Sequence, residues 1–210
     1  MSVLSRISFY QNSRSEIQNQ ELARDLASTR DEGGIREIAE HLWDKNTNVR
    51  SDCLKVLYEI GYISPDLIAP FTDDFIRLLS SKHNRMVWGG MIALSTVAPL
   101  KAPTLFGQRE AIYKTIENGS IITIDNGIKT LSTIAASESA FSEIIFPYLL
   151  NFLGECRPSD LPRHAEVVAK CVTDFNKNDF LSVLHNRQER LSVSQKNRIR
   201  ILEQKWIPNR

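Results

Sequence analysis

The sequence has few of the features that membrane insertion or disulfide bonding requires. No apolar run among its 210 residues approaches the about 18 residues that a membrane-spanning helix needs. The first 14 residues are polar and lack the apolar stretch of a signal peptide. The cysteines Cys53, Cys156 and Cys171 are odd in number, which argues against a disulfide framework and suits a reducing compartment. We therefore expect a cytoplasmic protein that does not enter membranes.

Motifs for phosphate, metal or catalytic chemistry are scarce as well. Nine glycines occur, and none belongs to a phosphate-binding loop followed by Lys and Ser or Thr. The four histidines include no His-x-x-x-His pair, and no Cys-x-x-Cys is present. Asp73 and Asp74 are adjacent, so on a helix they point about 100° apart and cannot act as a carboxylate pair. We expect both to face solvent, and we expect no metal ion, no cofactor and no enzymatic activity.

Charge of one sign is not in excess, since the net charge is +1. Residues 186–210 are the exception, with seven basic and two acidic side chains. This segment also has an apolar face, because Ile199, Leu202 and Trp206 follow helical spacing. We expect a solvated helix that caps the preceding structure. The alternative is that the basic segment contacts an acidic partner or a phosphate backbone.

The main positive feature is a repeat of 37 residues. Leu57, Leu94, Leu131 and Val168 follow one another at this step. The parallel columns that contain Val56, Ile60 and Cys53 keep the same step and, with Leu57, occupy positions i, i+3, i+4 and i+7 of a helix. The column Cys53, Gly90, Gly127 and His164 is mostly small, which predicts that a neighbouring helix comes close. We call the helices that carry these columns A helices.

A second set of columns predicts another helix in each period. Leu42, Leu79, Ile116 and Leu153 are again 37 residues apart, and Ile38, Phe75, Ile112 and Leu149 lie four residues before them. These form the apolar face of what we call the B helices. One hairpin of an A and a B helix cannot bury both faces, so successive hairpins must stack. The predicted A helices are 16–28, 47–61, 84–98, 121–136 and 160–174, the B helices are 33–44, 65–80, 103–118, 139–154 and 178–188, and a last helix is 194–206.

One copy of the repeat resembles the HEAT-repeat family. Between Asp44 and Gly61 the chain follows the family's order of turn acid, Val-Arg, small residue, paired apolar residues and closing glycine, carried by Asp44, Asn46, Val49, Arg50, Cys53, Val56, Leu57 and Gly61. Later copies lose the Val-Arg pair. Armadillo repeats, with three helices per unit, fit less well because each period has room for two. The resemblance implies a curved α-solenoid that binds something in its concave groove.

The expected fold is therefore all-α, a right-handed α-solenoid of about five HEAT-like hairpins with a C-terminal capping helix. We expect an N-terminal arm or extra cap at 1–15, the repeat domain at 16–188 and the basic capping helix at 189–210.

The resemblance implies that the B helices line the concave face. Side chains opposite the B-helix core would then form a groove of mixed charge. The candidate binding residues are Arg36, Glu40, Arg77, Arg109, Tyr113, Lys114 and Tyr148. Mixed charge favours a protein or peptide partner over a nucleic-acid duplex, which requires a stripe of Lys and Arg.

These observations predict a non-enzymatic scaffold or adaptor that binds another protein. The alternative is a DNA-binding HEAT-like protein such as a relative of the alkylpurine DNA glycosylases, some of which are built from such repeats. Those enzymes use aromatic residues and a carboxylate in a basic groove. Trp43, Trp88 and Trp206 are the tryptophans of this sequence, and none is expected to share the groove with an acid.

Overall fold

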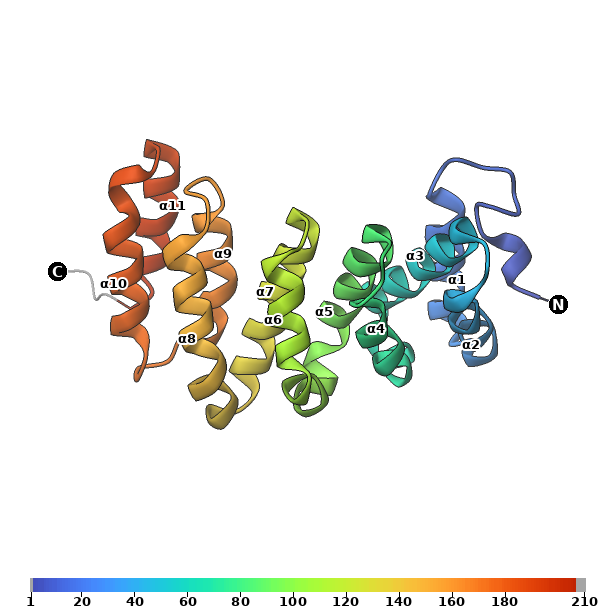
Figure 1. The fold of residues 1–210 in the computed structure, drawn as a ribbon, viewed down its shortest axis with the longest axis horizontal. Helices are drawn as coiled ribbons and strands as arrows, with labels where there is room; N and C mark the ends of the chain where they lie inside the picture. The colour runs from blue at the N-terminus through green and yellow to red at the C-terminus, as the bar shows by residue number, and fades with distance from the viewer. Residues whose placement is uncertain (1, 207–210) are drawn as a thin grey trace. The chain divides into compact units, whose positions relative to one another are not determined.

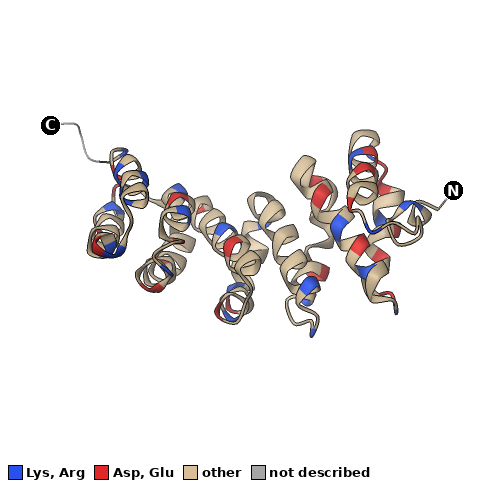
Figure 2. Cartoon of the chain, turned by 90° about the horizontal axis from the view of Figure 1, so that it is seen from above, with Lys and Arg blue, Asp and Glu red and all other residues tan. Residues whose placement is uncertain are grey.

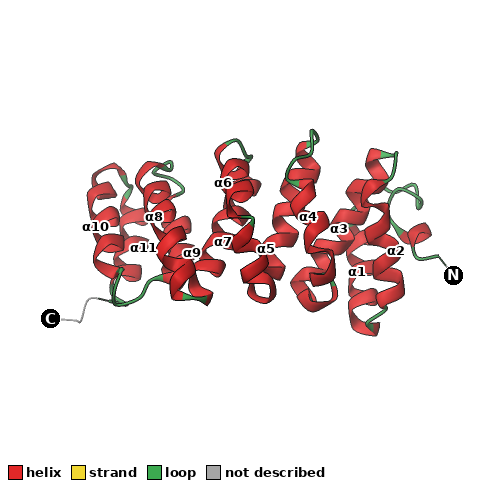
Figure 3. Cartoon of the chain, turned by 60° about the horizontal axis from the view of Figure 1, so that its bottom comes forward, coloured by secondary structure: helices red, strands yellow, loops and turns green. Residues whose placement is uncertain are grey.

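The computed structural model describes residues 2–206, which form α-helices and short 3-10 turns without any strand (Figures 1 and 3). Met1 of the predicted arm and residues 207–210 of the predicted capping segment, Arg210 among them, lie outside the described residues. The chain divides into two compact units, one ending at Gly127 and the other beginning at Ile128. We describe each unit by itself.

The first unit contains three stacked A helices and three B segments. The A helices are α1 (Ile17–Thr29), α3 (Thr47–Ile63) and the first part of α5 (Asn84–Gly107). The B segments are α2 (Glu32–Glu40), α4 (Thr72–Leu78) and α6 (Arg109–Glu117). Helix α3 packs against both α1 and α5, and α4 packs against α5. This is the layered packing that the repeat predicts.

Helix α7 (Ile121–Ser137) crosses from the first unit into the second. The second unit continues with α8 (Ser139–Glu155), α9 (Leu161–Val168), α10 (Lys177–Arg187) and α11 (Val193–Glu203). Helix α8 packs against α9 and α10, and α11 packs against α9.

The predicted core columns are buried, apart from Val167 in the Val56 column, which is half-buried. Leu57, Leu94, Leu131 and Val168 are fully buried at equivalent positions of successive A helices. The two B-helix columns are buried in the same way over all four copies. The small column also behaves as predicted. A Cβ atom added to Gly90 would lie 3.1 Å from the Phe75 carbonyl oxygen, and one added to Gly127 would lie 2.5 Å from Ile116 Cγ1. Neighbouring helices therefore approach closely there.

The B segment predicted at 65–80 is broken rather than continuous. Pro65–Leu67 and Ala69–Phe71 form separate 3-10 turns, and α4 begins only at Thr72. Pro65 and Pro70 each lack a backbone donor and restrict the preceding residue, which explains why a single helix does not form.

The A helix predicted at 160–174 is also shorter than expected. Helix α9 ends at Val168, and a 3-10 turn follows at Ala169–Cys171. The Asn176 side chain accepts a hydrogen bond from the Thr173 backbone N–H at 2.7 Å and donates one to the Cys171 carbonyl. Such local side-chain bonds offer the backbone an alternative to continuing the helix.

The break predicted between residues 98 and 103 is present inside α5. Two helical stretches meet there at a kink at Lys101, whose φ of −125° and ψ of 23° are not helical. A further break, which was not predicted, separates α5 from α6 at Gln108. Proline removes a donor and crowds the preceding turn, so Pro99 and Pro103 favour a kink between them.

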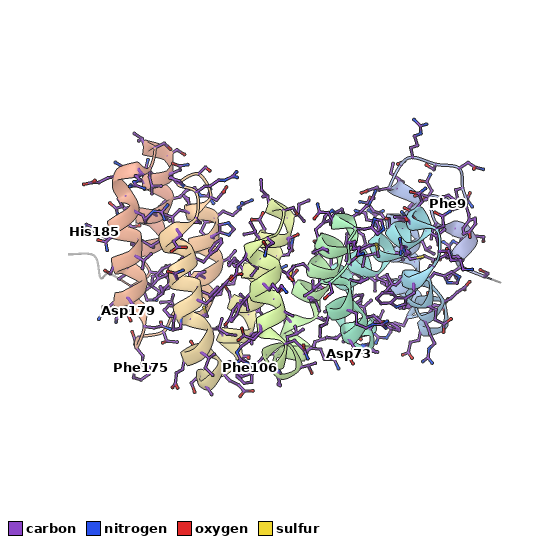
Figure 4. All side chains as sticks on the ribbon, in the orientation of Figure 1. Phe9, Asp73, Phe106, Phe175, Asp179 and His185 are labelled. Atoms are coloured by element: carbon purple, nitrogen blue, oxygen red, sulfur yellow. The ribbon has the colours of Figure 1, made fainter. Side chains whose placement is uncertain are left out.

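The N-terminal arm packs as a cap on the first hairpin. Ile7 is fully buried, and the Ser8 backbone N–H donates to Asn19 Oδ1 at 2.9 Å. The Phe9 backbone N–H donates to Asp52 Oδ2 on α3 at 2.7 Å, and Phe9 is labelled in Figure 4. Asn19 lies 37 residues before Val56, so it belongs to the same column of the repeat. In α1 this position has no preceding hairpin to pack against, and the Asn19 side-chain amide bonds the arm instead.

The last helix packs as predicted for a capping helix. Ile199 and Leu202 are buried, and the Trp206 ring meets Phe180 edge-on with 5.6 Å between centroids. Arg198 binds the Glu166 carboxylate on α9 through two nitrogens, at 2.9 and 2.8 Å. Within residues 2–206 no helix has both the length and the apolar content that crossing a membrane would take.

Candidate functional site

The B segments of the first unit present the face on which most of the candidate residues lie. We define this B-helix face by α2, the 3-10 turn His41–Trp43, the segment from Pro70 to Lys82, and α6. Arg36, Glu40, Arg77 and Lys114 are exposed on it, as predicted for residues opposite the core columns. Residues of both charge signs occur along the helices of the chain (Figure 2).

A first hollow of about 540 Å³ lies between α2 and α4. Its lining residues are Arg36, Ala39, Glu40, Trp43, Pro70, Phe71, Asp74 and Arg77. The structure therefore brings together three of the predicted residues, Arg36, Glu40 and Arg77. Two guanidinium groups, two carboxylates and three apolar rings give this hollow balanced charge and apolar surface.

Trp43 organises one side of the first hollow. The Arg77 guanidinium lies over the indole ring, 4.1 Å from its centroid, and the indole N–H donates to Asp74 Oδ1 at 3.1 Å. Arg77 also pairs with Asp74 at 3.3 Å. Trp43 nevertheless keeps 45% of its surface exposed. A half-exposed indole held by a cation and a hydrogen bond is a preorganised surface for an apolar group.

This arrangement corrects two predictions. Trp43 does share the face with an acid, because α2 ends at Glu40 and the 3-10 turn His41–Trp43 directs the indole toward Asp74. Of the two adjacent carboxylates, Asp73 is exposed as predicted and is labelled in Figure 4, whereas Asp74 is bound by Trp43 and Arg77. Helical periodicity cannot reveal this contact, since Trp43 lies beyond the end of the regular helix.

A second hollow of about 570 Å³ lies on the same face, between the end of α4 and α6. Its lining residues are Leu79, Ser80, Ser81, Lys82, Asn84, Val87, Ala111, Lys114, Thr115, Asn118 and Gly119. Lys82 and Lys114 are exposed, and no carboxylate is among the lining residues. This hollow is therefore cationic, unlike the first. Lys114 was predicted, and Lys82 was missed because it lies in the turn after the B segment.

The remaining candidates line neither hollow. Arg109 lies over the Phe106 ring, 4.8 Å from its centroid, and donates to the Phe106 carbonyl at 3.2 Å (Phe106 is labelled in Figure 4). Tyr113 is half-buried, and burial raises the pKa of its hydroxyl. Tyr148 is half-buried on α8, in the second unit. Their roles in binding remain predictions.

Two observations concern the groups that could hold a metal ion or act as nucleophiles. Among residues 2–206 no three His, Cys, Asp or Glu side chains lie close enough together to hold a metal ion. Burial raises the pKa of the Cys171 thiol to about 12 and that of Cys156 to about 11. Neither thiol is therefore ionised at neutral pH, the state in which cysteine acts as a nucleophile.

Comparison with known proteins identifies the fold without identifying a relative. No family model matches the sequence, and no curated protein matches it. Solved structures do match. A designed armadillo repeat protein in complex with the peptide (KR)4 has a TM-score of 0.70 at 13% identity, covering 98% of this chain and 100% of that chain.

Two further structures give the same result. Computationally designed armadillo repeat proteins for modular peptide recognition match with a TM-score of 0.67 at 14% identity, over 95% of this chain and 88% of that chain. An engineered protein solved as a structural-genomics target matches with a TM-score of 0.68 at 16% identity, over 97% of this chain and 96% of that chain. The chain therefore has the all-α helical-repeat fold shared by armadillo- and HEAT-like solenoids.

Proposed function

We propose that this chain is a non-enzymatic binding module that holds an extended segment of another protein on the B-helix face of its first unit. The main support is the pair of hollows between successive B segments, one apolar with balanced charge and one cationic. Two of the similar designed proteins are described as bound to a peptide or made for peptide recognition. In this proposal the repeat domain is 16–188, flanked by the arm at 1–15 and the helix at 189–210.

The two hollows specify the chemistry of the segment. An apolar side chain would pack on Trp43, Pro70 and Phe71, and an acidic side chain would meet Lys82 and Lys114. Stacked helices lie about 10 Å apart, and an extended chain advances about 3.3 Å per residue. Because successive side chains of an extended chain point to opposite sides, the apolar and acidic side chains should be about two or four residues apart. Aromatic and Arg anchors of this kind carry most of the binding energy at protein interfaces.

A displayed peptide library selected on the wild-type protein tests this proposal. Peptides that bind should lose about tenfold or more in affinity when Arg77→Ala and Lys114→Ala are combined, because each removes an anchor group. Arg24→Ala, at an exposed position on the A helix α1, is the matched control and should leave the affinity unchanged. Binding that survives the double substitution, or that Arg24→Ala abolishes, would show that the B-helix face is not the site.

The DNA-binding alternative has one observation in its favour, the pairing of Trp43 with Asp74. Against it, the hollow beside this pair balances Arg36 and Arg77 with Glu40 and Asp74. A phosphate backbone favours an excess of cations. Duplex affinity that falls steeply with added salt, together with release of methylated bases, would establish this alternative. We expect neither.

We further propose a cytoplasmic location. All three cysteines are free, and Cys53 and Cys171 are buried in the core. Unpaired core thiols are typical of proteins from reducing compartments. Fluorescence microscopy of a tagged chain in its source cell tests this proposal, and retention in an oxidising compartment would contradict it.

A further inference from the structure

Phe175 is the most exposed large apolar residue among the described residues, at 99% of its surface. It lies in the connection between the 3-10 turn Ala169–Cys171 and α10, and it is labelled in Figure 4. This connection is ordered by its own hydrogen bonds. The Asn176 side chain binds both Thr173 and Cys171, and the Lys177 backbone N–H donates to the Thr173 carbonyl at 3.0 Å. The fold thus presents this phenyl ring to solvent on a fixed turn.

Phe175 forms one wall of a hollow of about 650 Å³ that lies wholly in the second unit. The opposite wall is the first half of α8. The lining residues are Ser139, Ser142, Glu143, Phe146, Pro147, Thr173, Asp174, Phe175 and Asn176. Phe146, Pro147 and Phe175 supply apolar surface on both walls. The hydroxyl and amide groups around them can bond a peptide backbone. Pockets that combine apolar walls with a few polar groups are typical binding sites.

Two carboxylates and no cation are among the lining residues of this hollow. Asp174 is already paired with Lys177, whose ammonium nitrogen lies 2.8 Å from Asp174 Oδ1, and this hydrogen bond lowers the pKa of the Asp174 carboxyl group. Glu143 is exposed and makes no ion pair within residues 2–206. Glu143 therefore favours a ligand that carries a cation beside its apolar group.

We propose that this hollow is a docking site for a partner protein segment that inserts an aromatic or branched aliphatic side chain next to a Lys or Arg. The apolar side chain would fill the space between Phe146, Pro147 and Phe175. The adjacent cation would lie beside Glu143, where it can also face the Phe175 ring. The site is independent of the B-helix face of the first unit, and neither proposal requires the other.

A small probe set tests the site by two-dimensional amide NMR. The probe is 2-phenylethylammonium, which carries an aromatic ring and a cation, and the comparators are neutral 2-phenylethanol and anionic 3-phenylpropionate. The ammonium should bind in the millimolar range, with saturable shifts confined to 139–147 and 173–177. The anion should bind more weakly than the neutral alcohol.

Variants separate the two parts of the proposal. Phe175→Ser should abolish binding of all three probes, and the ring is exposed, so the fold should be kept. Glu143→Gln should lower the affinity for the ammonium about two- to fivefold, as expected for an exposed ion pair, and leave the alcohol unchanged. Ile201→Ser, at another exposed apolar residue of the same unit, is the control. The combined Arg77→Ala and Lys114→Ala variant should bind the probes normally, which distinguishes this site from the first.

Three results would overturn the proposal. The first is an absence of saturable shifts in 139–147 and 173–177. The second is tighter binding of 3-phenylpropionate than of the ammonium. The third is a wild-type dimer in sedimentation that Phe175→Ser dissociates, because a second copy of the chain would then occupy the hollow.

Discussion

His164 is the one large residue in a column that otherwise holds Cys53, Gly90 and Gly127. It is buried, and its ring meets Phe152 edge-on with 4.9 Å between centroids. Burial, assisted by the Arg163 charge, lowers the pKa of this imidazole from 6.5 to about 4. Between pH 6.5 and about pH 4 the His164 imidazole is therefore neutral in the folded protein and protonated in the unfolded chain. The free energy of unfolding should be fully retained above pH 6.5 and should fall as the pH drops toward 4.

Chemical denaturation across this pH range checks the prediction. His164→Gln should lower stability at pH 7 but should show a smaller loss between pH 6.5 and pH 4 than wild type does. His83→Gln, at an exposed position, serves as the matched control and should keep the wild-type profile. Identical slopes for wild type and His164→Gln would show that His164 is not the group responsible.

Residues could be predicted where one helical face decides their environment. The columns through Leu57 and Ile38 are buried because apolar spacing alone determines which side of a helix faces the core. Trp43 could not be predicted in this way. Its contacts with Asp74 and Arg77 depend on a 3-10 turn and on where the next B segment begins. Lys82 and Phe175 could not be predicted either, because both lie outside the helices, where helical spacing says nothing about their environment. Both line hollows.

At the scale of elements, the N-terminal arm should contribute to stability as part of the core. Ile7→Ala should cost about 2–5 kcal/mol, since its side chain is fully buried against the first hairpin. Urea denaturation measures this, with the exposed Ser5→Ala as the control, for which a change within about 0.5 kcal/mol is expected. Equal effects of the two substitutions would mean that the arm does not cap the hairpin in solution.

Helix ends were predicted less well than helix positions. The starts of α3 and α5 match the predicted 47 and 84 because the periodic apolar face begins there. The break around Pro65 and Pro70 differs from prediction, since a proline can end, delay or bend a helix and its packing decides which. Lys101 carries the kink in α5 although it is not itself a proline.

At the scale of the whole molecule, a constant step of 37 residues was enough to predict the fold class. Each hairpin has an apolar face that it cannot bury alone, and packing against the next hairpin buries that face in every copy. The binding surface follows from that fold only in part. Arg36, Glu40 and Arg77 meet in one hollow because they share the outer side of successive B segments. Which partner binds there depends on chemistry that repeats do not encode.

The central claim is that the B-helix face of the first unit binds a protein segment. Hydrogen–deuterium exchange of the wild-type protein, with and without a saturating selected peptide, tests it most directly. The account predicts slower exchange in Glu32–Glu40, Thr72–Leu78 and Arg109–Glu117, with the A helices Ile17–Thr29 and Thr47–Ile63 unchanged. Protection confined to those A helices would contradict it.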